Sequence, residues 1–120
     1  MKYGLKDATI RKIRSVLAAH PEVEQAVIYG SRARGDYKNG SDIDLTLRGK
    51  ANLTMRVLYR VMDELDDLLL PYTMDLSIME SIDDLGVLEQ IRRHGAVFYD
   101  KAIYRSEEEP PCSAKSCNAE

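Results

Sequence analysis

A glycine–serine pair and two aspartates one residue apart are the groups in this sequence best suited to chemistry. Gly30 and Ser31 end one apolar run, and Asp42 and Asp44 begin the next, with residues 32–41 between the pairs. Side chains on a strand alternate between faces, so the two aspartates are expected to share one face. Neighbouring carboxylates repel each other unless their pKa values rise, solvent surrounds them or a divalent cation binds between them. By itself, the motif is also typical of a polar turn.

A third aspartate strengthens the metal interpretation. Asp75 lies in the middle of an alternating run, residues 73–79, whose opposite side is apolar. A carboxylate at such a position is uncommon unless it is exposed, hydrogen-bonded, paired or bound to metal. If this run lies beside residues 42–48, three carboxylates meet on one face. Carboxylate oxygens are ligands that Mg²⁺ prefers. Two such ions, ~3.5 to 4 Å apart, can stabilise the entering and the leaving oxygen of a phosphoryl displacement. We therefore expect Asp42, Asp44 and Asp75 to be metal ligands and catalytic residues.

The glycine–serine pair has the properties of a phosphate-binding turn. Residues 31–34 can form one helical turn with Ser31 as its N-cap, followed by a polar loop at residues 35–41. The Ser31 hydroxyl and the backbone N–H groups that follow Gly30 can bind the oxygens of a phosphate group. Glycine also lets the backbone come close to a ligand.

The loop after this turn is basic. Arg32, Arg34 and Lys38 can contact a triphosphate or an acidic partner, or they can be ordinary solvated loop charges. We place Arg32 and Arg34 among the candidate nucleotide-binding residues. Tyr29 and Tyr37 can stack on a base, although Tyr29, at the end of a strand, also fits a core position.

Alternating helices and strands are expected to hold these groups in place. Apolar residues spaced three and four apart predict helices, and alternating apolar residues predict strands. The pattern indicates an α/β fold in which helices pack on a small mixed sheet. Asn52 is the expected N-cap of the second long helix. The expected helices span residues 6–20, 52–69 and 81–95, and the strands span 23–29, 42–48, 73–79 and, at one edge, 97–99.

Composition limits the remaining possibilities. The 120 residues suffice for one domain, and 44% hydrophobic with 31% charged residues is typical of a globular protein. A formal net charge of -3 disfavours a surface that grips nucleic acid without sequence preference. We expect a domain at residues 1–100 and a disordered tail at 101–120, in which Cys112 and Cys117 have no chemical role. The N-terminus lacks an export signal, so the cytoplasm is the expected location.

The combination of Gly30-Ser31, the following gap, Asp42-x-Asp44 and Asp75 resembles the signature of nucleotidyltransferases of the DNA polymerase-β superfamily. The small size and the loop sequence Gly-Ser-Arg-Ala-Arg-Gly are most similar to the minimal nucleotidyltransferases (MNT) of HEPN/MNT toxin–antitoxin pairs. The resemblance implies a polymerase-β-like fold in which Asp42 and Asp44 bind both ions. The resemblance also implies that Asp75 is the third metal ligand and helps to activate the nucleophile. It implies that Gly30 and Ser31 bind phosphate.

The implied activity is Mg²⁺-dependent transfer of a nucleotide monophosphate, AMP from ATP, to a tyrosine hydroxyl of a HEPN toxin, with this protein as the antitoxin. The sequence contains no polymerase-like finger or thumb and no helical substrate domain, so a partner is expected to supply the acceptor. Two alternatives stay open. One is nucleotidylation of a small molecule such as an antibiotic, and the other is a non-catalytic antitoxin that acts by binding alone.

Overall fold

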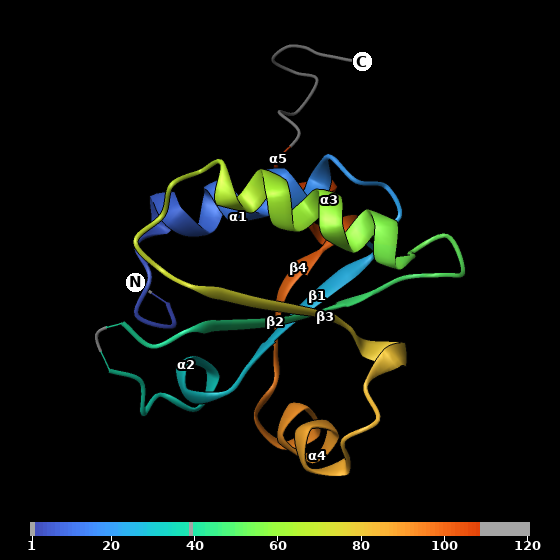
Figure 1. Ribbon diagram of the computed structural model, residues 1–120. Coiled ribbons are helices and arrows are strands. Elements are labelled where there is room, and N and C mark those ends of the chain that lie inside the picture. The colour runs from blue at the N-terminus through green and yellow to red at the C-terminus, as the bar shows by residue number, and fades with distance from the viewer. Residues whose placement is uncertain (1, 39, 109–120) are drawn as a thin grey trace.

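The computed structural model describes residues 2–38 and 40–108, and the side chains of these residues up to Tyr104. In this part of the chain, one four-stranded sheet is covered by helices on both faces (Figure 1). In chain order the elements are α1 (Asp7–Ala18), β1 (Gln25–Tyr29), α2 (Ser31–Arg34), β2 (Ile43–Arg48), α3 (Met55–Asp66), β3 (Met74–Ile78), the 3-10 turn η1 (Met79–Ser81), α4 (Leu85–His94), β4 (Ala96–Asp100) and α5 (Lys101–Glu108).

The sheet is mixed, as the sequence predicts. Its strand order is β3-β2-β1-β4, with β1 antiparallel to both β2 and β4. The pairing of β2 with β3 is parallel. A parallel pair needs a crossover connection, and α3 supplies it by returning the chain across one face of the sheet. This crossover places the third predicted strand directly beside the second.

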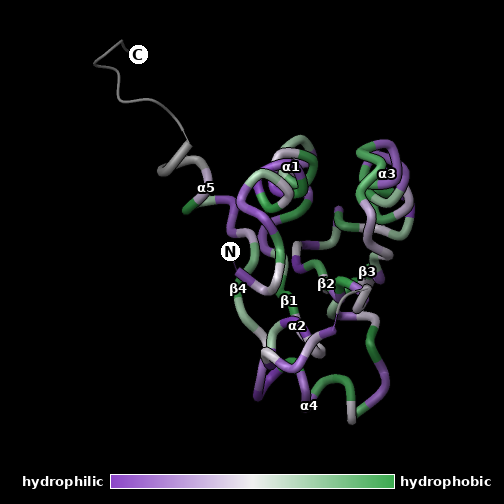
Figure 2. Tube along the Cα trace, turned by 90° about the vertical axis from the view of Figure 1, so that its left-hand side faces the viewer, coloured by the Kyte–Doolittle hydropathy of each residue, from purple (hydrophilic) through white to green (hydrophobic). Residues whose placement is uncertain are grey.

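The two faces of the sheet are covered differently. Helices α1 and α3 lie on one face, and α2 and α4 lie on the other (Figures 1 and 2). The face of β2 that carries Ile43, Leu45 and Leu47 is fully buried in a core shared with apolar residues of α1 and α3. Because side chains alternate along a strand, Asp44 lies on the opposite face, the side of α2 and α4.

Two helices begin later than predicted. The Thr54 side chain accepts a hydrogen bond from the backbone N–H of Val57, so Thr54 is the N-cap of α3, and the expectation of Asn52 is wrong. Residues 50–53 instead form a turn that buries Leu53. In the same way Asp84 caps α4 by accepting from the N–H groups of Gly86 and Val87.

The C-terminal part of the chain is more regular than predicted up to Glu108. The sequence pattern predicts a disordered tail from Lys101, whereas α5 follows β4 directly. The Asp100 side chain accepts from the N–H groups of Ala102 and Ile103, and the Tyr104 ring packs against Tyr99 at a centroid distance of 5.6 Å. Cys112 and Cys117 lie outside the described residues. No helix within the described part of the chain is long and apolar enough to span a membrane.

Candidate active site

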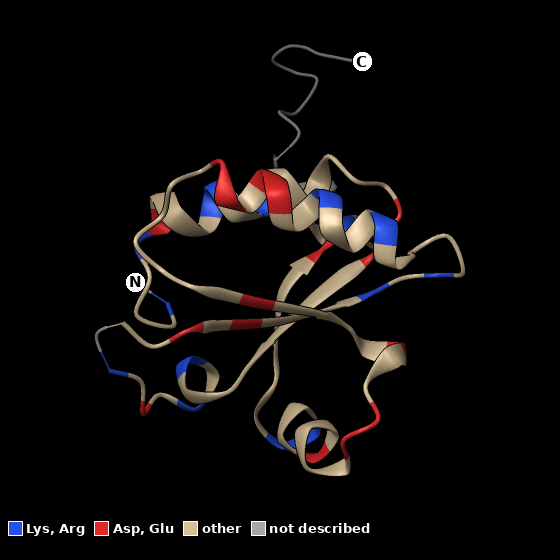
Figure 3. Ribbon diagram, in the orientation of Figure 1, with Lys and Arg blue, Asp and Glu red and all other residues tan. Residues whose placement is uncertain are grey.

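The parallel pairing of β2 and β3 brings two of the three predicted carboxylates together. Asp44 on β2 is the register partner of Asp75 on β3. Figure 3 shows the two acidic positions side by side on neighbouring strands. Partners in register have side chains on the same face of a sheet, so both carboxylates lie on the side of α2 and α4. Asp42 comes just before β2, two residues from Asp44, and the alternation of side chains along an extended chain gives it the same face.

Gly30 lies directly against Asp44. Tyr29, the last residue of β1, is the register partner of Asp44, and Gly30 follows it with φ +79° and ψ -158°. A Cβ atom at position 30 would collide with the Asp44 carboxylate. Only glycine adopts this backbone conformation readily and leaves room for the carboxylate. The contact with Asp44 therefore requires glycine at position 30 whether or not a ligand binds there.

Negative charges are crowded around Asp44 and are only partly compensated. Burial raises the pKa of Asp44, and the negative charges of Asp75 and Asp42 raise it further. The positive charge of Arg34 opposes these effects and lowers the pKa of Asp44. A bound cation would compensate the same repulsion.

The donor chemistry fits a hard divalent cation, because three carboxylates adjoin an open face. Asp42 and Asp75 are exposed and Asp44 is half-buried. Within the described part of the chain, however, no three His, Cys, Asp or Glu side chains are grouped closely enough to hold a metal ion. The backbone therefore brings the carboxylates near one another without converging their oxygens on one point.

Hydroxyl groups that are not among the predicted site residues lie beside the carboxylates. Ser77 Oγ donates to Thr46 Oγ1 at 2.9 Å, and Ser77 also forms a hydrogen bond with the Tyr29 hydroxyl. Burial raises the pKa of Tyr29; the bond to Ser77 opposes this, and the charges of Asp75 and Asp44 add to it. Ser77 and Thr46 lie two residues beyond Asp75 and Asp44, so the same alternation that grouped the aspartates could have found them.

Ser31 is the first residue of α2, and its predicted N-cap position is taken by Gly30. Its side chain is partly exposed and makes no hydrogen bond to any described residue. The backbone N–H groups of Arg34 and Gly35 are used inside the turn, where they donate to the carbonyls of Gly30 and Ser31. The Ser31 hydroxyl is thus available to a ligand near the carboxylates.

Arg34 lies at the rim of the site. Its guanidinium donates to Gln90 on α4 at 2.9 Å and to the Asp36 carboxylate at 3.3 Å. Its positive charge also acts on Asp44 and lowers the pKa of that carboxyl, against the larger effects that raise it. Lys38, farther along the loop, is exposed.

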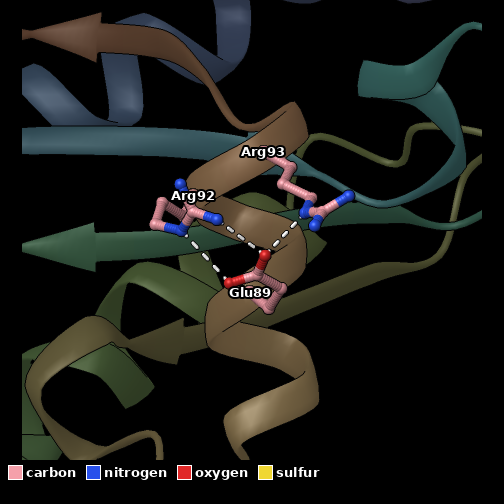
Figure 4. A network of polar contacts seen from close by, with 3 residues as sticks. All are labelled: Glu89, Arg92 and Arg93. Carbon is pink, nitrogen blue, oxygen red and sulfur yellow. Dashed lines mark hydrogen bonds and ion pairs between the residues drawn. The ribbon is translucent and has the colours of Figure 1, made fainter.

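Two further arginines on this side of the sheet, Arg92 and Arg93, are paired within α4. Glu89 accepts hydrogen bonds from Arg92 and Arg93 on the same helix (Figure 4). These hydrogen bonds, from Arg92 first and then Arg93, hold the pKa of Glu89 below its ordinary value. Glu89 therefore offsets part of the positive charge of α4.

The Arg32 side chain is held inside the protein, whereas the sequence predicts that it contacts the nucleotide. Its side chain is only 3% exposed, and its guanidinium binds backbone carbonyls within the protein. A buried arginine is uncommon, so the sequence pattern alone gave no reason to expect it.

The candidate site does not coincide with the hollow that has the best-defined shape on the described part of the molecule. A hollow of about 550 Å³ is found at the opposite end of β1 and β2, lined in part by Glu24, Arg48 and Asp100 and by none of the three aspartates. Shape alone would point to that hollow, whereas the concentration of chemical groups points to the carboxylate face. We base the site on the chemistry, because the hollow contains no comparable group of ligands or nucleophiles.

Comparison with known families agrees with this choice. The family model described as polymerase beta nucleotidyltransferase matches residues 11–104, which include Gly30, Ser31 and all three aspartates. No curated protein sequence matches the chain.

Solved structures share the fold at low sequence identity. A chain of a toxin–antitoxin complex crystallised with AMP-PNP is 20% identical, with a TM-score of 0.60 over 80% of this chain and 74% of that chain. A chain of the tri-AMPylated Shewanella oneidensis HEPN toxin in complex with MNT antitoxin is 16% identical, with a TM-score of 0.60 over 85% and 78%. A chain of the MntA-HepT toxin–antitoxin is 16% identical, with a TM-score of 0.59 over 85% and 82%.

Proposed function

The chain belongs to the polymerase beta nucleotidyltransferase family, and from this premise we propose that it transfers AMP from ATP to a tyrosine hydroxyl of a HEPN toxin, for which it is the antitoxin. The observation that carries the proposal is the register of β2 with its two neighbours, which sets Asp44 beside Asp75 of β3 and against the Gly30 backbone that follows β1. Support for the acceptor comes from the similarly folded HEPN/MNT complex that contains an AMPylated toxin.

Two Mg²⁺ ions would be held by Asp42, Asp44 and Asp75, whose side chains would turn toward a common point as they bind. The ions would supply charge neutralisation at the triphosphate and lower the pKa of the acceptor hydroxyl. Burial and the neighbouring carboxylates raise the pKa of Asp44, so cation binding also relieves a repulsion already present in the fold.

The residues of the chain then have separate roles in the transfer. Ser31 and the Gly30 backbone bind phosphate oxygens, and Arg34 contributes positive charge at the rim. Asp75, exposed on edge strand β3, accepts the proton of the acceptor hydroxyl. The tyrosine oxygen forms a bond to the α-phosphorus, the bond from that phosphorus to the bridging oxygen breaks, and pyrophosphate leaves.

The small size of the domain explains why the acceptor should be a protein. Nucleotide and ions would fill most of the carboxylate face of so small a domain, which leaves little surface to orient a second substrate. Orientation of the reactants is a large share of what such catalysis requires. A partner protein contributes its own binding surface, whereas a free antibiotic does not.

Radiolabelled ATP tests the reaction class. With the purified HEPN partner and Mg²⁺, label in the α-phosphate should appear on the partner, and label in the γ-phosphate should not. Asp44→Asn should abolish the transfer, whereas Asp63→Asn, the same change at an exposed position on α3, should not. Transfer of the γ-label would indicate a kinase, and efficient labelling of an aminoglycoside with no labelling of the partner would indicate antibiotic modification.

A further inference from the structure

Arg32 is the most deeply buried charged side chain near the site. It is 3% exposed, and three of its N–H groups donate to backbone carbonyls. Nε and Nη2 donate to the Ser41 carbonyl at 3.0 and 2.9 Å, and Nη1 donates to the Tyr3 carbonyl at 2.9 Å. A charged donor that is removed from water needs such partners, and here the main chain supplies them.

Two aromatic rings flank the same guanidinium. Its central carbon lies 5.4 Å from the Tyr37 ring centroid and 4.9 Å from that of Tyr72. Gly4 closes the third side: a Cβ there would lie 2.9 Å from Nη1 of Arg32 and 2.7 Å from Cζ of Tyr37. Arg32 is therefore held by the N-terminal turn, the basic loop and the segment that leads into β3.

The carbonyl that Arg32 holds is next to the metal-binding strand. Ser41 immediately precedes Asp42, and it closes the turn of the basic loop by bonding Lys38 through both its backbone N–H and its hydroxyl. Arg32 itself follows Ser31 in α2. One guanidinium thus spans the two halves of the motif: the turn after Gly30 and the residue before Asp42.

We propose that Arg32 is a positioning residue, which fixes the phosphate-binding turn and the start of the aspartate strand at one spacing. The proposal rests on the proposed function, because the spacing matters only if nucleotide binds at the turn and metal binds at the aspartates. An error of an ångström in such a spacing is enough to reduce catalysis by about a hundredfold.

The planar fork of arginine is what the position requires. Nε and Nη2 bind one carbonyl together while Nη1 reaches a second, and the guanidinium carbon also lies over the Tyr37 and Tyr72 rings. A lysine ammonium has the same charge, but it cannot donate in this fixed fork or stack in the same way. Arg32→Lys therefore preserves charge and removes the positioning.

Arg14 provides a matched control. Its Nε donates to the Phe98 carbonyl at 2.8 Å, and its guanidinium lies 5.5 Å from the Phe98 ring centroid. It has the same two kinds of contact as Arg32, but it joins α1 to β4, on the opposite face of the sheet from the carboxylates.

Amide hydrogen exchange in the nucleotide-free protein tests the positioning without any catalysis. Arg32→Lys should speed exchange at the Ser41 and Ile43 amides, both hydrogen-bonded in the structure, by about tenfold. Arg14→Lys should leave these two amides unchanged. Unchanged exchange in Arg32→Lys would overturn the proposal.

Kinetics with the HEPN partner and ATP separate positioning from nucleotide contact. Arg32→Lys should lower kcat about tenfold or more and raise the Mg²⁺ concentration needed for half-maximal rate, with little change in KM for ATP. Arg14→Lys should retain both parameters. A raised KM for ATP with kcat retained would assign Arg32 to the nucleotide and overturn the proposal.

A milder variant covers the case in which Arg32→Lys does not fold. Tyr37→Leu removes one stacked ring at a partly exposed position and should produce the same changes in smaller measure. Wild-type-like exchange and kcat in Tyr37→Leu, with Arg32→Lys unfolded, would contradict the proposal. If the wild-type protein transfers no nucleotide, the proposed function fails, and the exchange result still decides whether Arg32 holds the loop.

Discussion

Asp44 is the residue at which burial, charge and backbone geometry meet. It is half-buried, the charges of Asp75 and Asp42 act on it, and the Gly30 backbone packs against its carboxylate. Its raised pKa means that the charged carboxylate lowers the stability of the folded protein when no cation is present. A residue that destabilises the protein where it lies is a candidate for function.

The first prediction concerns this loss of stability. Asp44→Asn should abolish transfer and raise the melting temperature of the metal-free protein near neutral pH. The folded protein holds a proton on Asp44 that the unfolded chain has already lost, so stability falls as pH rises from the ordinary pKa of aspartate through the raised one. The wild-type protein should show this loss in a series of melts with EDTA as the pH is raised above the ordinary pKa of aspartate, and Asp44→Asn should not.

Asp63→Asn, at an exposed position on α3, controls for the loss of one negative charge. An Asp44→Asn protein that melts lower than wild type at neutral pH would show that the carboxylate is stabilising. The interpretation of crowded charges would then be wrong.

The second prediction concerns Gly30. Gly30→Ala should cost about 1–3 kcal/mol in free energy of unfolding, because glycine alone readily adopts its backbone conformation. It should also displace the Asp44 carboxylate and remove transfer. Gly35→Ala separates the two effects, since Gly35 has φ +92° and no atom within 4 Å of the added Cβ. Denaturant unfolding and transfer assays on both variants provide the measurement, and equal loss of transfer in the two would argue against the specific collision.

At the scale of elements, β4 and α5 form the end of the described chain. Tyr104 on α5 packs against Tyr99 on β4, and the Asp100 side chain caps the helix. A chain that ends at Asp100 should therefore melt about 5 °C lower than one that ends at Glu108, which retains the aromatic pair. The chain ending at Glu108 should melt close to the full sequence. Equal melting of the two truncated proteins would show that α5 contributes nothing to stability.

The sequence predicted the elements more reliably than their ends. Alternation and three–four spacing reflect which faces are buried, and burial decides most of the energy of a strand or helix. Helix ends depend instead on which of several polar residues bonds a free N–H, so the preference for Thr54 over Asn52 was not readable from spacing.

Part of the site could be predicted for the same reason. Asp42 and Asp44 share a face by alternation alone, but the pairing of Asp44 with Asp75 required a parallel register that only the folded sheet defines. The burial of Arg32 depends on Tyr37 in the loop that follows it and on Tyr3 and Tyr72, which come from two distant segments. Local patterns carry no information on such convergence.

At the scale of the whole molecule, the loop charges should guide the partner. Arg34 and Lys38 form a basic rim beside the carboxylate face of a chain with net charge -3. Arg34→Glu with Lys38→Glu should weaken transfer to the HEPN partner, most strongly at low salt, because screening reduces the repulsion that the change creates. Lys38→Glu alone should leave ATP binding nearly unchanged, because Lys38 is exposed and lies farther along the loop than Arg34.

The control reverses two exposed arginines of α3, Arg56→Glu with Arg60→Glu, on the opposite side of the sheet. Calorimetry with AMP-PNP and transfer rates at two salt concentrations measure both properties. Equal weakening by the two pairs would indicate a general effect of net charge and no specific contact at the rim.

Mass spectrometry of the HEPN partner, purified after co-expression with this protein, tests the central claim most directly. The account predicts a partner that carries AMP on a tyrosine, and an unmodified partner when Asp44→Asn replaces the wild-type chain. Asp63→Asn should leave the modification in place. An unmodified partner that is nevertheless neutralised by the wild-type protein would contradict the account and establish an antitoxin that acts by binding alone.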